Sequence, residues 1–496
     1  MLTMLQRSVL PFLTATFLLL ALIPYTSTAQ RNITYMDLIR RSESPNIYTT
    51  EMTLPGEPGK NSAQNFIISY RIKNSFLTYK KRNSPGYSEA RSGDNGQTGS
   101  ERDNYFAPIE VGLEVFHYEK DIPGSPKKKR KRLEDVELNK LKPASRNFVK
   151  DTAYAKSYNH TTAADLFVNG SLDVDLATGN YIYVFTIGQG GKDKPDYKIQ
   201  KLVRVTPMGT DSSKAAFFTR TMSEGKGELL NIGDRILYGQ DFYTSIHLPD
   251  YNPDKDYHFK VHKLSVERDD TTRQATQFDK ILDENEISRN LKPSYSLEQG
   301  KPFIRFEKIG NGQGRTFAHI KVPGSTFPNT FYSISLFEAD KDKPIYKNRV
   351  QSLWIDMPKS LLNINVALDM LRFIVPEEKL DKLKQGSFEE KREKFNKFWA
   401  EKDPTPSTQY NELMDEYYKR IDYAFREFGS MRVPGYRTDQ GKVYIQYGEP
   451  ADKERSYPTG GRSIEVWEYP DKNLKFTFRA STGFGDYKLV EKESLN

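Results

Sequence analysis

The chain contains no cysteine, and its 496 residues include only six histidines and three tryptophans. Without thiols it has no disulfide, no thiolate nucleophile, no cysteine-ligated zinc and no iron–sulfur cluster. The serine nucleophile elbow, the phosphate-binding loop and the His-Glu-x-x-His zinc motif are absent as well. These absences remove the common catalytic classes, and we expect neither a metal nor a cofactor.

The residues that are present indicate a folded protein of several domains. Hydrophobic residues make up 36% of the chain and charged residues 28%, with a formal net charge of +8. That much apolar material fills several cores, so general disorder is excluded, and the length predicts about three domains. The 30 tyrosines and 29 phenylalanines favour half-buried sheet surfaces, and we therefore expect a β-rich protein.

The first 29 residues have the anatomy of a cleaved secretory signal peptide. Arg7 supplies a positive charge, an apolar stretch runs from Val9 to Ile23, and small residues precede the expected cleavage between Ala29 and Gln30. The alternative is a membrane-anchoring helix, but prolines interrupt the stretch and it falls short of a span of about 20 residues. We therefore expect an extracytoplasmic protein, periplasmic or secreted, with no transmembrane segment in the mature chain.

Short alternating segments predict two β-rich regions, residues 30–207 and residues 208–356. In the first, residues 109–115 alternate between apolar and polar side chains, which is the pattern of a strand with one solvent-facing side. Many such strands, separated by polar turns, favour a mainly antiparallel, Ig-like β-sandwich domain in each region. We also expect a strand over residues 76–79 and a helical turn over residues 278–282.

A run of six cations lies in the predicted loop 120–150 of the first region. Such a run cannot lie in a core, so it is either a solvated hairpin loop or a contact for an anionic polymer such as a glycan or a lipid headgroup. Export and the lack of interleaved aromatic residues argue against nucleic acid. The residues of this candidate basic patch are Lys127, Lys128, Lys129, Arg130, Lys131 and Arg132.

Two histidines four residues apart, His258 and His262, have a spacing that chelates a metal on a helix. Here they alternate with Tyr257, Phe259 and Val261, which predicts a strand. Four strand residues separate the two imidazoles by roughly 13 Å, which is too far for one ion. This pair therefore does not change the expectation of no metal site.

Helical patterns replace the alternation in residues 357–496. Ser387 and Glu390 form a capping box, and Thr405 is the expected N-cap of the longest helix. Residues 438–441 then predict a turn, and residues 442–447 the first strand of a small antiparallel sheet. We expect this third region to be an α+β domain in which the long helix covers one face of the sheet.

An ordered set of motifs spans about 395–490, at residues 398–399, 403–406, 411–412, 417–420, 435–439, 441–450, 465–469 and 483–490. This set resembles the signature of the GWxTD domain family. Tyr436 stands where the family's name has tryptophan, so the aromatic position is kept without the indole N–H. The resemblance implies a secreted bacterial protein with β-rich regions ahead of its C-terminal domain, and it implies no established activity.

The segment around Tyr436, Arg437 and Asp439 has a structural and a functional interpretation. As structure, Asp439 opens a turn in which Gly441 takes a positive φ, while Tyr436 plugs the joint between helix and sheet. As a site, the three side chains bind a ligand, and Asp439 acts as an acid or base with Glu449 as its partner. Catalytic carboxylates normally come in such pairs with separated pKa values.

Three functional hypotheses follow from these observations, and one of them is an anionic-surface binder that works through the basic patch Lys127–Arg132. The leading one is an exported, non-catalytic protein of the cell envelope that binds an envelope protein or glycan. The alternative is a carboxylate-dependent hydrolase that acts on envelope polymers through Asp439 and either Glu449 or Glu454.

Overall fold

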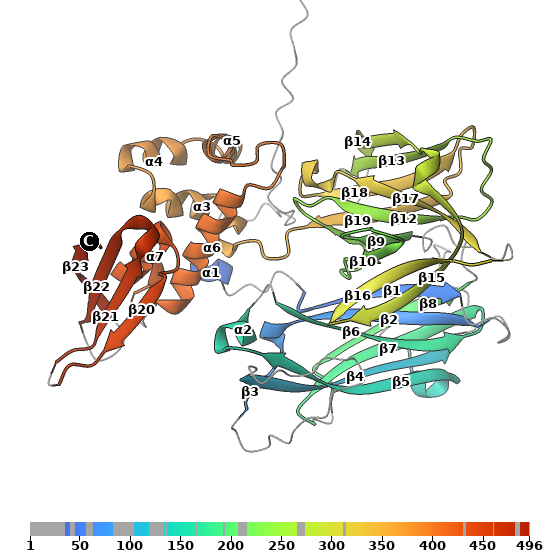
Figure 1. Ribbon diagram of the computed structural model, residues 1–496, viewed down its shortest axis with the longest axis horizontal. Helices are drawn as coiled ribbons and strands as arrows, with labels where there is room; N and C mark the ends of the chain where they lie inside the picture. The colour runs from blue at the N-terminus through green and yellow to red at the C-terminus, as the bar shows by residue number, and fades with distance from the viewer. Residues whose placement is uncertain are drawn as a thin grey trace, which may run out of the picture. The chain divides into compact units, whose positions relative to one another are not determined.

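The computed structural model describes fourteen stretches of the chain, which divides into two compact units: residues 43–356, and residues 357–496 together with the segment up to residue 42 (Figure 1). The predicted signal peptide, with Ala29 and Gln30, and the basic run Lys127–Arg132 lie outside the described residues. The described residues are 35–39, 45–55, 63–82, 104–118, 133, 136–163, 166–191, 194–206, 216–264, 273–310, 314–429, 433–459, 461–481 and 487–495.

Two sheets pack face to face in the first half of the β unit. Sheet A has the strand order β1-β2-β6, and sheet B has the order β3-β4-β7-β8 with β5 also paired to β4. Buried apolar side chains from both sheets, such as Ile68, Val111 and Phe185, form one core. The strands are β1 (Ile47–Pro55), β2 (Gln64–Lys73), β3 (Lys80–Lys81), β4 (Tyr105–His117), β5 (Pro143–Ala155), β6 (Phe167–Leu176), β7 (Gly179–Gln189) and β8 (Tyr197–Val205).

Two further sheets form the second half of this unit. Sheet C has the order β10-β16-β15-β17-β12-β9 and sheet D the order β11-β19-β18-β13-β14. All their pairs are antiparallel except β11 with β19. The strands are β9 (Ala216–Thr219), β10 (Lys226–Glu228), β11 (Arg235–Leu237), β12 (Phe242–Leu248), β13 (Tyr257–Leu264), β14 (Arg273–Ile281), β15 (Ile287–Glu298), β16 (Lys301–Lys308), β17 (Arg315–Val322), β18 (Phe331–Glu338) and β19 (Tyr346–Leu353).

A further buried apolar cluster joins the two halves of the β unit. Met52 and Ile67 of sheet A lie in one buried cluster with Ile304 and Phe317 of sheet C. Sheet A is thus buried on both faces, against sheet B on one side and sheet C on the other. The predicted division at residues 207 and 208 falls inside this compact unit.

Two local predictions in the β unit are wrong. Residues 278–281 belong to strand β14 rather than to a helical turn, because they pair with residues 258–261 of β13. Residues 74–76 form a short 3-10 helix, closed by the bond from Leu77 N–H to Asn74 O at 3.0 Å, instead of starting a strand. The predicted strand around His258 and His262 is confirmed as β13.

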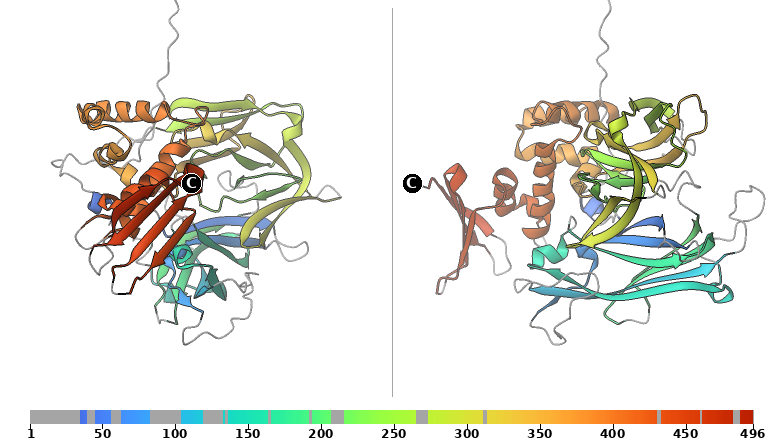
Figure 2. Two further views of the ribbon diagram at one scale, coloured as in Figure 1. Left: turned by 60° about the vertical axis from the view of Figure 1, so that its left-hand side comes forward. Right: turned by 45° about the vertical axis from the view of Figure 1, so that its right-hand side comes forward.

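The second unit combines helices with a four-stranded antiparallel sheet of order β20-β21-β22-β23. Figure 2 shows this sheet as a layer with helices α6 and α7 on one side of it. The helices are α1 (Tyr35–Ile39), α3 (Ile364–Met370), α4 (Glu377–Lys384), α5 (Phe388–Ala400), α6 (Glu412–Glu427) and α7 (Asp439–Tyr447), and the strands are β20 (Asp452–Ser456), β21 (Ile464–Tyr469), β22 (Leu474–Ala480) and β23 (Tyr487–Glu493).

The predicted fold class is confirmed: antiparallel β-sheets are followed by helices and a small antiparallel sheet. The capping box of Ser387 and Glu390 opens α5 as expected. The longest helix, however, starts after Asn411 rather than Thr405, because the Asn411 side chain accepts a bond from Met414 N–H at 2.8 Å and donates one to Trp399 O at 2.9 Å. No helix within the described ranges combines the length and apolar character that crossing a membrane requires.

Residues 439–447 form helix α7, and the predicted turn and strand at this place are wrong. Val443 and Tyr444 of α7 are buried against Trp467 and Phe476 of the sheet. Val443, Ile445 and Tyr447 alternate like a strand, but Gln440, Val443 and Tyr444 also have the spacing of one helix face. Gly441 is therefore helical, and the positive φ belongs to Gly448, which ends α7 with a φ of 85°.

Candidate functional site

Two glycines of the signature allow three backbones to approach closely. Gly435 begins the 3-10 helix η8 (Gly435–Arg437), and a Cβ placed on it would lie 1.9 Å from the carbonyl oxygen of Ala424 in α6. A Cβ on Gly441 in α7 would lie 1.9 Å from the carbonyl oxygen of Gly435. Any larger residue at either position would separate α6, η8 and α7.

Tyr436 lies buried among aromatic rings from helical segments. Its ring centroid is 6.1 Å from that of Phe425 in α6, 5.6 Å from Tyr35 in α1 and 6.4 Å from Phe373. Tyr436 thus packs between helices, and the ring contacts described for it include no residue of the sheet. Arg437 next to it is exposed, with its guanidinium carbon 5.8 Å from the Tyr436 ring centroid.

The N-terminal helix α1 belongs to this unit through Asp422. That carboxylate accepts hydrogen bonds from the Tyr35 hydroxyl and from the backbone N–H groups of Lys359, at 2.5 Å, and Ser360, at 3.3 Å. Burial raises the pKa of Asp422 above its ordinary value. A segment more than 300 residues away in the sequence, flanking the predicted signal peptide, therefore completes the surroundings of Tyr436.

Thr438 and Asp439 hold the start of α7. The Thr438 hydroxyl donates to Gly435 O at 2.7 Å and accepts from Gly441 N–H at 3.0 Å, which makes Thr438 the N-cap. Asp439 accepts from Leu489 N–H of β23 at 3.2 Å and lies 3.4 Å from Lys442 Nζ. Asp439 therefore ties the helix to the sheet, with its negative charge at the favourable end of the helix dipole.

The candidate catalytic carboxylates are not brought together. Asp439 is the first residue of α7, whereas Glu449 follows its last residue by two positions. A nine-residue helix is about 13 Å long, so nearly the whole length of α7 separates them. Glu454 lies exposed on β20 opposite Val466, on the sheet face that faces away from Trp467.

A different carboxylate, Glu465 of β21, lies at the centre of a buried polar cluster. Its Oε1 accepts from Gln440 Nε2 at 3.0 Å, Trp467 Nε1 at 2.8 Å and Lys453 Nζ at 3.0 Å. Its Oε2 accepts from Arg455 Nε at 2.8 Å and Nη2 at 2.5 Å. Gln440 comes from α7, so this one side chain connects the signature segment to two strands of the sheet.

The charge state of Glu465 follows from its partners. Burial pushes its pKa up, but hydrogen bonds from Trp467, Arg455 and Lys453 outweigh burial and hold the pKa below the ordinary value. Glu465 is therefore an anion at neutral pH with its acceptor positions filled. Two cations surround one carboxylate, so this cluster carries a surplus of positive charge.

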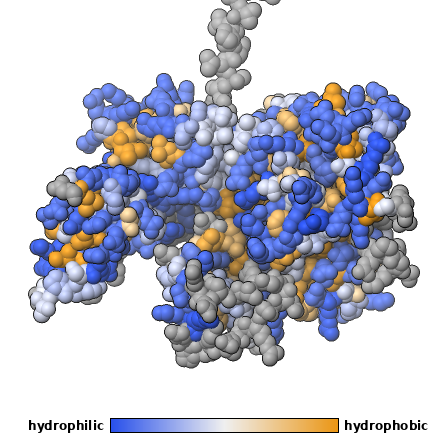
Figure 3. Space-filling model, in the orientation of Figure 1, coloured by the Kyte–Doolittle hydropathy of each residue, from blue (hydrophilic) through white to orange (hydrophobic). Residues whose placement is uncertain are grey.

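An open cleft of about 970 Å³ lies over this cluster. Lys453 and Arg455 are each 46% exposed, and Arg462 adds a third cation to the lining. The ring of Tyr457 is 74% exposed beside them. On the face shown in Figure 3, hydrophobic side chains gather only in small groups among hydrophilic ones. We therefore take this charged cleft with its exposed ring as the candidate binding site of this unit.

The GWxTD domain family model matches residues 346–496. This region is a GWxTD domain. The match confirms the resemblance read from residues 395–490 and extends it to strand β19 at its beginning. A search among curated proteins finds no match to the chain.

In the GWxTD domain, sequence reasoning identified the signature but missed Glu465. The sequence contains a pattern that predicts its burial. Glu465, Trp467 and Tyr469 alternate along a strand and share one face, so Glu465 lies on the same buried face as two large aromatic residues. Lys453 and Arg455 are also two residues apart, and on the neighbouring strand they lie opposite Trp467 and Glu465. Over the described parts of the chain, no group of three His, Asp or Glu side chains is placed to hold a metal ion.

Proposed function

We propose that this protein is exported to the cell envelope and that its GWxTD domain binds an envelope protein or glycan without catalysing a reaction. Export rests on the leader-like first 29 residues with Ala29 and Gln30 at the expected cleavage point. The binding role rests on the cleft beside Glu465.

The observation that carries the proposal is a group of exposed cations and an exposed tyrosine ring around Glu465, a carboxylate whose acceptor positions are filled. Arg455 donates two hydrogen bonds to Glu465, which fix its position, and Arg455 and Arg462 both line the cleft. Tyr457 supplies a flat apolar surface next to them. Such a cleft suits a partner that carries carboxylates on a sugar ring or a peptide.

The hydrolase alternative lacks this kind of support. Glycoside hydrolysis by two carboxylates requires a separation of roughly 5–10 Å, and α7 holds Asp439 and Glu449 farther apart. Glu465 has a lowered pKa and filled acceptor positions, so it is neither an acid near neutral pH nor a free base.

The binding proposal is tested with fluorescein-labelled polygalacturonate as an acidic glycan and dextran as a neutral one. We expect Arg462→Ala and Tyr457→Ala each to weaken polygalacturonate binding about tenfold, because each removes one contact of the cleft. Arg479→Ala, an exposed arginine on the other face of the sheet, is the matched control. Capture of proteins from an envelope extract with the same variants tests for a protein partner. Equal binding by wild type and all variants in both assays would contradict the proposal that this cleft is the binding site.

Export has its own test. A fusion of residues 1–29 to a reporter enzyme that is active only outside the cytoplasm should be active, and replacing leucines of the apolar stretch by arginine should abolish that activity. Activity that persists after this change would contradict the signal-peptide interpretation.

A further inference from the structure

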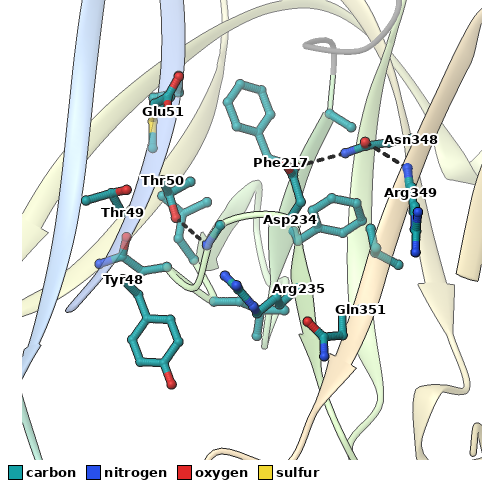
Figure 4. Close-up of a pocket in the computed structure, with 18 of the residues that line it drawn as sticks. Tyr48, Thr49, Thr50, Glu51, Phe217, Asp234, Arg235, Asn348, Arg349 and Gln351 are labelled. Atoms are coloured by element: carbon teal, nitrogen blue, oxygen red, sulfur yellow. Dashed lines mark hydrogen bonds between the residues drawn. The ribbon is translucent and has the colours of Figure 1, made fainter. Parts of the chain in front are cut away.

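The β unit contains a second cleft, of about 700 Å³, where the edges of its four sheets meet. Strand β1 is an edge of sheet A, β8 of sheet B, β9 of sheet C and β11 of sheet D, and residues of all four strands line the cleft. Figure 4 shows Tyr48–Glu51 of β1 on one side and Asn348 and Arg349 of β19 on the other. Edge strands expose backbone donors and acceptors on one side, and β1 brings such an edge to this cleft.

The register of β1 tells which of its backbone groups face the cleft. Lys73 N–H donates to Asn46 O at 2.8 Å, and these residues lie opposite each other in the antiparallel β1–β2 ladder. Alternate residues in such a ladder bond to the partner strand, so residues 48, 50 and 52 bond to β2. The N–H and C=O groups of Thr49, Glu51 and Thr53 point away from β2.

Part of this edge is already covered. Gly233 N–H donates to the Thr50 hydroxyl at 3.0 Å, and a Cβ on Gly233 would lie 3.1 Å from Thr49 O. This places the loop before β11 beside Thr49 and agrees with a Thr49 carbonyl that points out of sheet A. Among the described residues no backbone group is bonded to those of Glu51 and Thr53 on this side.

The composition of β1 protects its edge only at its end. The strand reads Ile-Tyr-Thr-Thr-Glu-Met-Thr-Leu-Pro, with no lysine, one charged residue at Glu51 and one proline at its last position, Pro55. Strand β20, an edge of the sheet in the GWxTD domain, reads Asp-Lys-Glu-Arg-Ser and is exposed along its whole length. Natural sheets use such charged edges to prevent pairing, and between Ile47 and Leu54 the edge of β1 carries the single charge of Glu51.

The side chains around the cleft define what a paired strand would carry. Phe217 and Phe218 of β9 and Ile199 of β8 are apolar. Arg235 and Arg349 also line the cleft, together with two carboxylates: Glu51 pairs with Lys201, and Asp234 accepts a hydrogen bond from Asn348. None of the ion pairs between described residues involves either arginine. The guanidinium of Arg235 lies over Tyr48, and that of Arg349 over Phe331.

We propose that the cleft binds an extended acidic peptide of another protein, which adds to sheet A as a strand beside β1. Its backbone bonds to Glu51 and Thr53, and its acidic side chains pair with Arg235 and Arg349. Arg235 lies over Tyr48, so it is on the side of sheet A to which the even-numbered side chains of β1 point. Side chains of an added strand alternate between the two sides in the same way. Every second residue of the peptide is therefore acidic and faces the arginines, and the residues between are apolar.

The test uses fluorescein-labelled (Asp-Val)₄ as the probe and (Lys-Val)₄ as its charge-reversed control, with binding followed by fluorescence anisotropy on the purified protein. We expect (Asp-Val)₄ to bind at least about tenfold more tightly than (Lys-Val)₄ and to lose affinity as salt is added. Arg235→Gln and Arg349→Gln should each lower the affinity and the salt dependence. Equal binding of the two peptides, or no binding of (Asp-Val)₄ at about 1 mM, would overturn the proposal.

Backbone pairing is tested with a matched pair of variants. Thr53→Pro removes an N–H that faces the cleft and leaves the β1–β2 ladder intact, whereas Thr53→Val keeps this N–H. We expect about tenfold weaker binding for the first and unchanged binding for the second. Equal affinities of the two variants would contradict strand addition.

Two N-methylated probes make the test independent of protein folding. One carries the methyl groups on the Asp nitrogens and the other on the Val nitrogens. Because alternate N–H groups of a strand face opposite sides, only one of the two peptides should lose affinity. Equal affinities of the two methylated peptides would refute the proposal.

Discussion

Replacing Glu465 by glutamine removes the negative charge from the cluster that connects α7 to β20 and β21. The glutamine keeps an oxygen for Gln440 and Trp467 but loses the charge-assisted bonds to Lys453 and Arg455. Hydrogen bonds to a charged group are worth about 1.5–3 kcal/mol each, and water recovers part of this because both cations are 46% exposed. We expect the GWxTD domain to lose roughly 2 kcal/mol of unfolding free energy.

The assay is thermal unfolding of the purified protein at pH 7, with the transition of the GWxTD domain followed separately from that of the β unit. A loss of roughly 2 kcal/mol in a domain of this size lowers Tm by about 4–8 °C. Glu468→Gln on the same strand is the matched control: Glu468 faces the other side of the sheet, and its change should stay within about 0.5 kcal/mol.

The pH dependence of this difference tests the electrostatic reasoning. The folded pKa of Glu465 lies below the ordinary glutamate value of 4.5, so its charge stabilises the domain above pH 4.5. This contribution disappears as the pH falls through the folded pKa. The gap between wild type and Glu465→Gln should therefore narrow below pH 4.5. A gap that stays constant, or a variant as stable as wild type at pH 7, would refute the role given to Glu465.

Three further changes test other parts of the structure. Gly435→Ala should destabilise the GWxTD domain by about 2–3 kcal/mol in urea unfolding, because its Cβ would collide with a carbonyl of α6, and near-wild-type stability would contradict that contact. Thr438→Val should cost about 1–2 kcal/mol through the lost N-cap of α7, a loss that should be absent if residues 439–447 formed a strand. Burial holds the pKa of His319 near 4 against an ordinary 6.5, so the neutral form is favoured on folding and the β unit should lose stability as pH falls from 6.5 toward 4. His319→Gln should reduce that slope in urea titrations, and an unchanged slope would contradict the burial of its charge.

Much of the fold could be predicted from the sequence because its signals are local. The alternation in residues 109–115 depends only on neighbouring residues, and β4 has it. The capping box of Ser387 and Glu390 satisfies backbone N–H donors at the helix start within four residues, so it can be predicted from the sequence without knowledge of any tertiary contact. The signature of the GWxTD domain is likewise an ordered set of short motifs, each of which is local in the sequence, and the family match bears it out.

The errors occur where two local patterns compete and packing decides. Residues 443–447 fit both the period of a strand and that of a helix. Burial of Val443 and Tyr444 against the sheet, together with the Thr438 cap, selects the helix. That choice turns Asp439 from a turn residue into the first residue of α7 and moves Glu449 to the other end of it.

The sequence alone determined the fold class, the absence of thiol chemistry and the GWxTD domain, since composition, periodicity and an ordered set of short motifs carry these. Only the tertiary structure decided which polar groups meet: Glu465 of β21 binds Gln440 of α7 and Lys453 and Arg455 of β20, and the edge strand β1 meets the edges of three other sheets. The reason is physical. Periodicity fixes which side of an element is apolar, whereas the partner of a polar group depends on contacts between residues far apart in the chain.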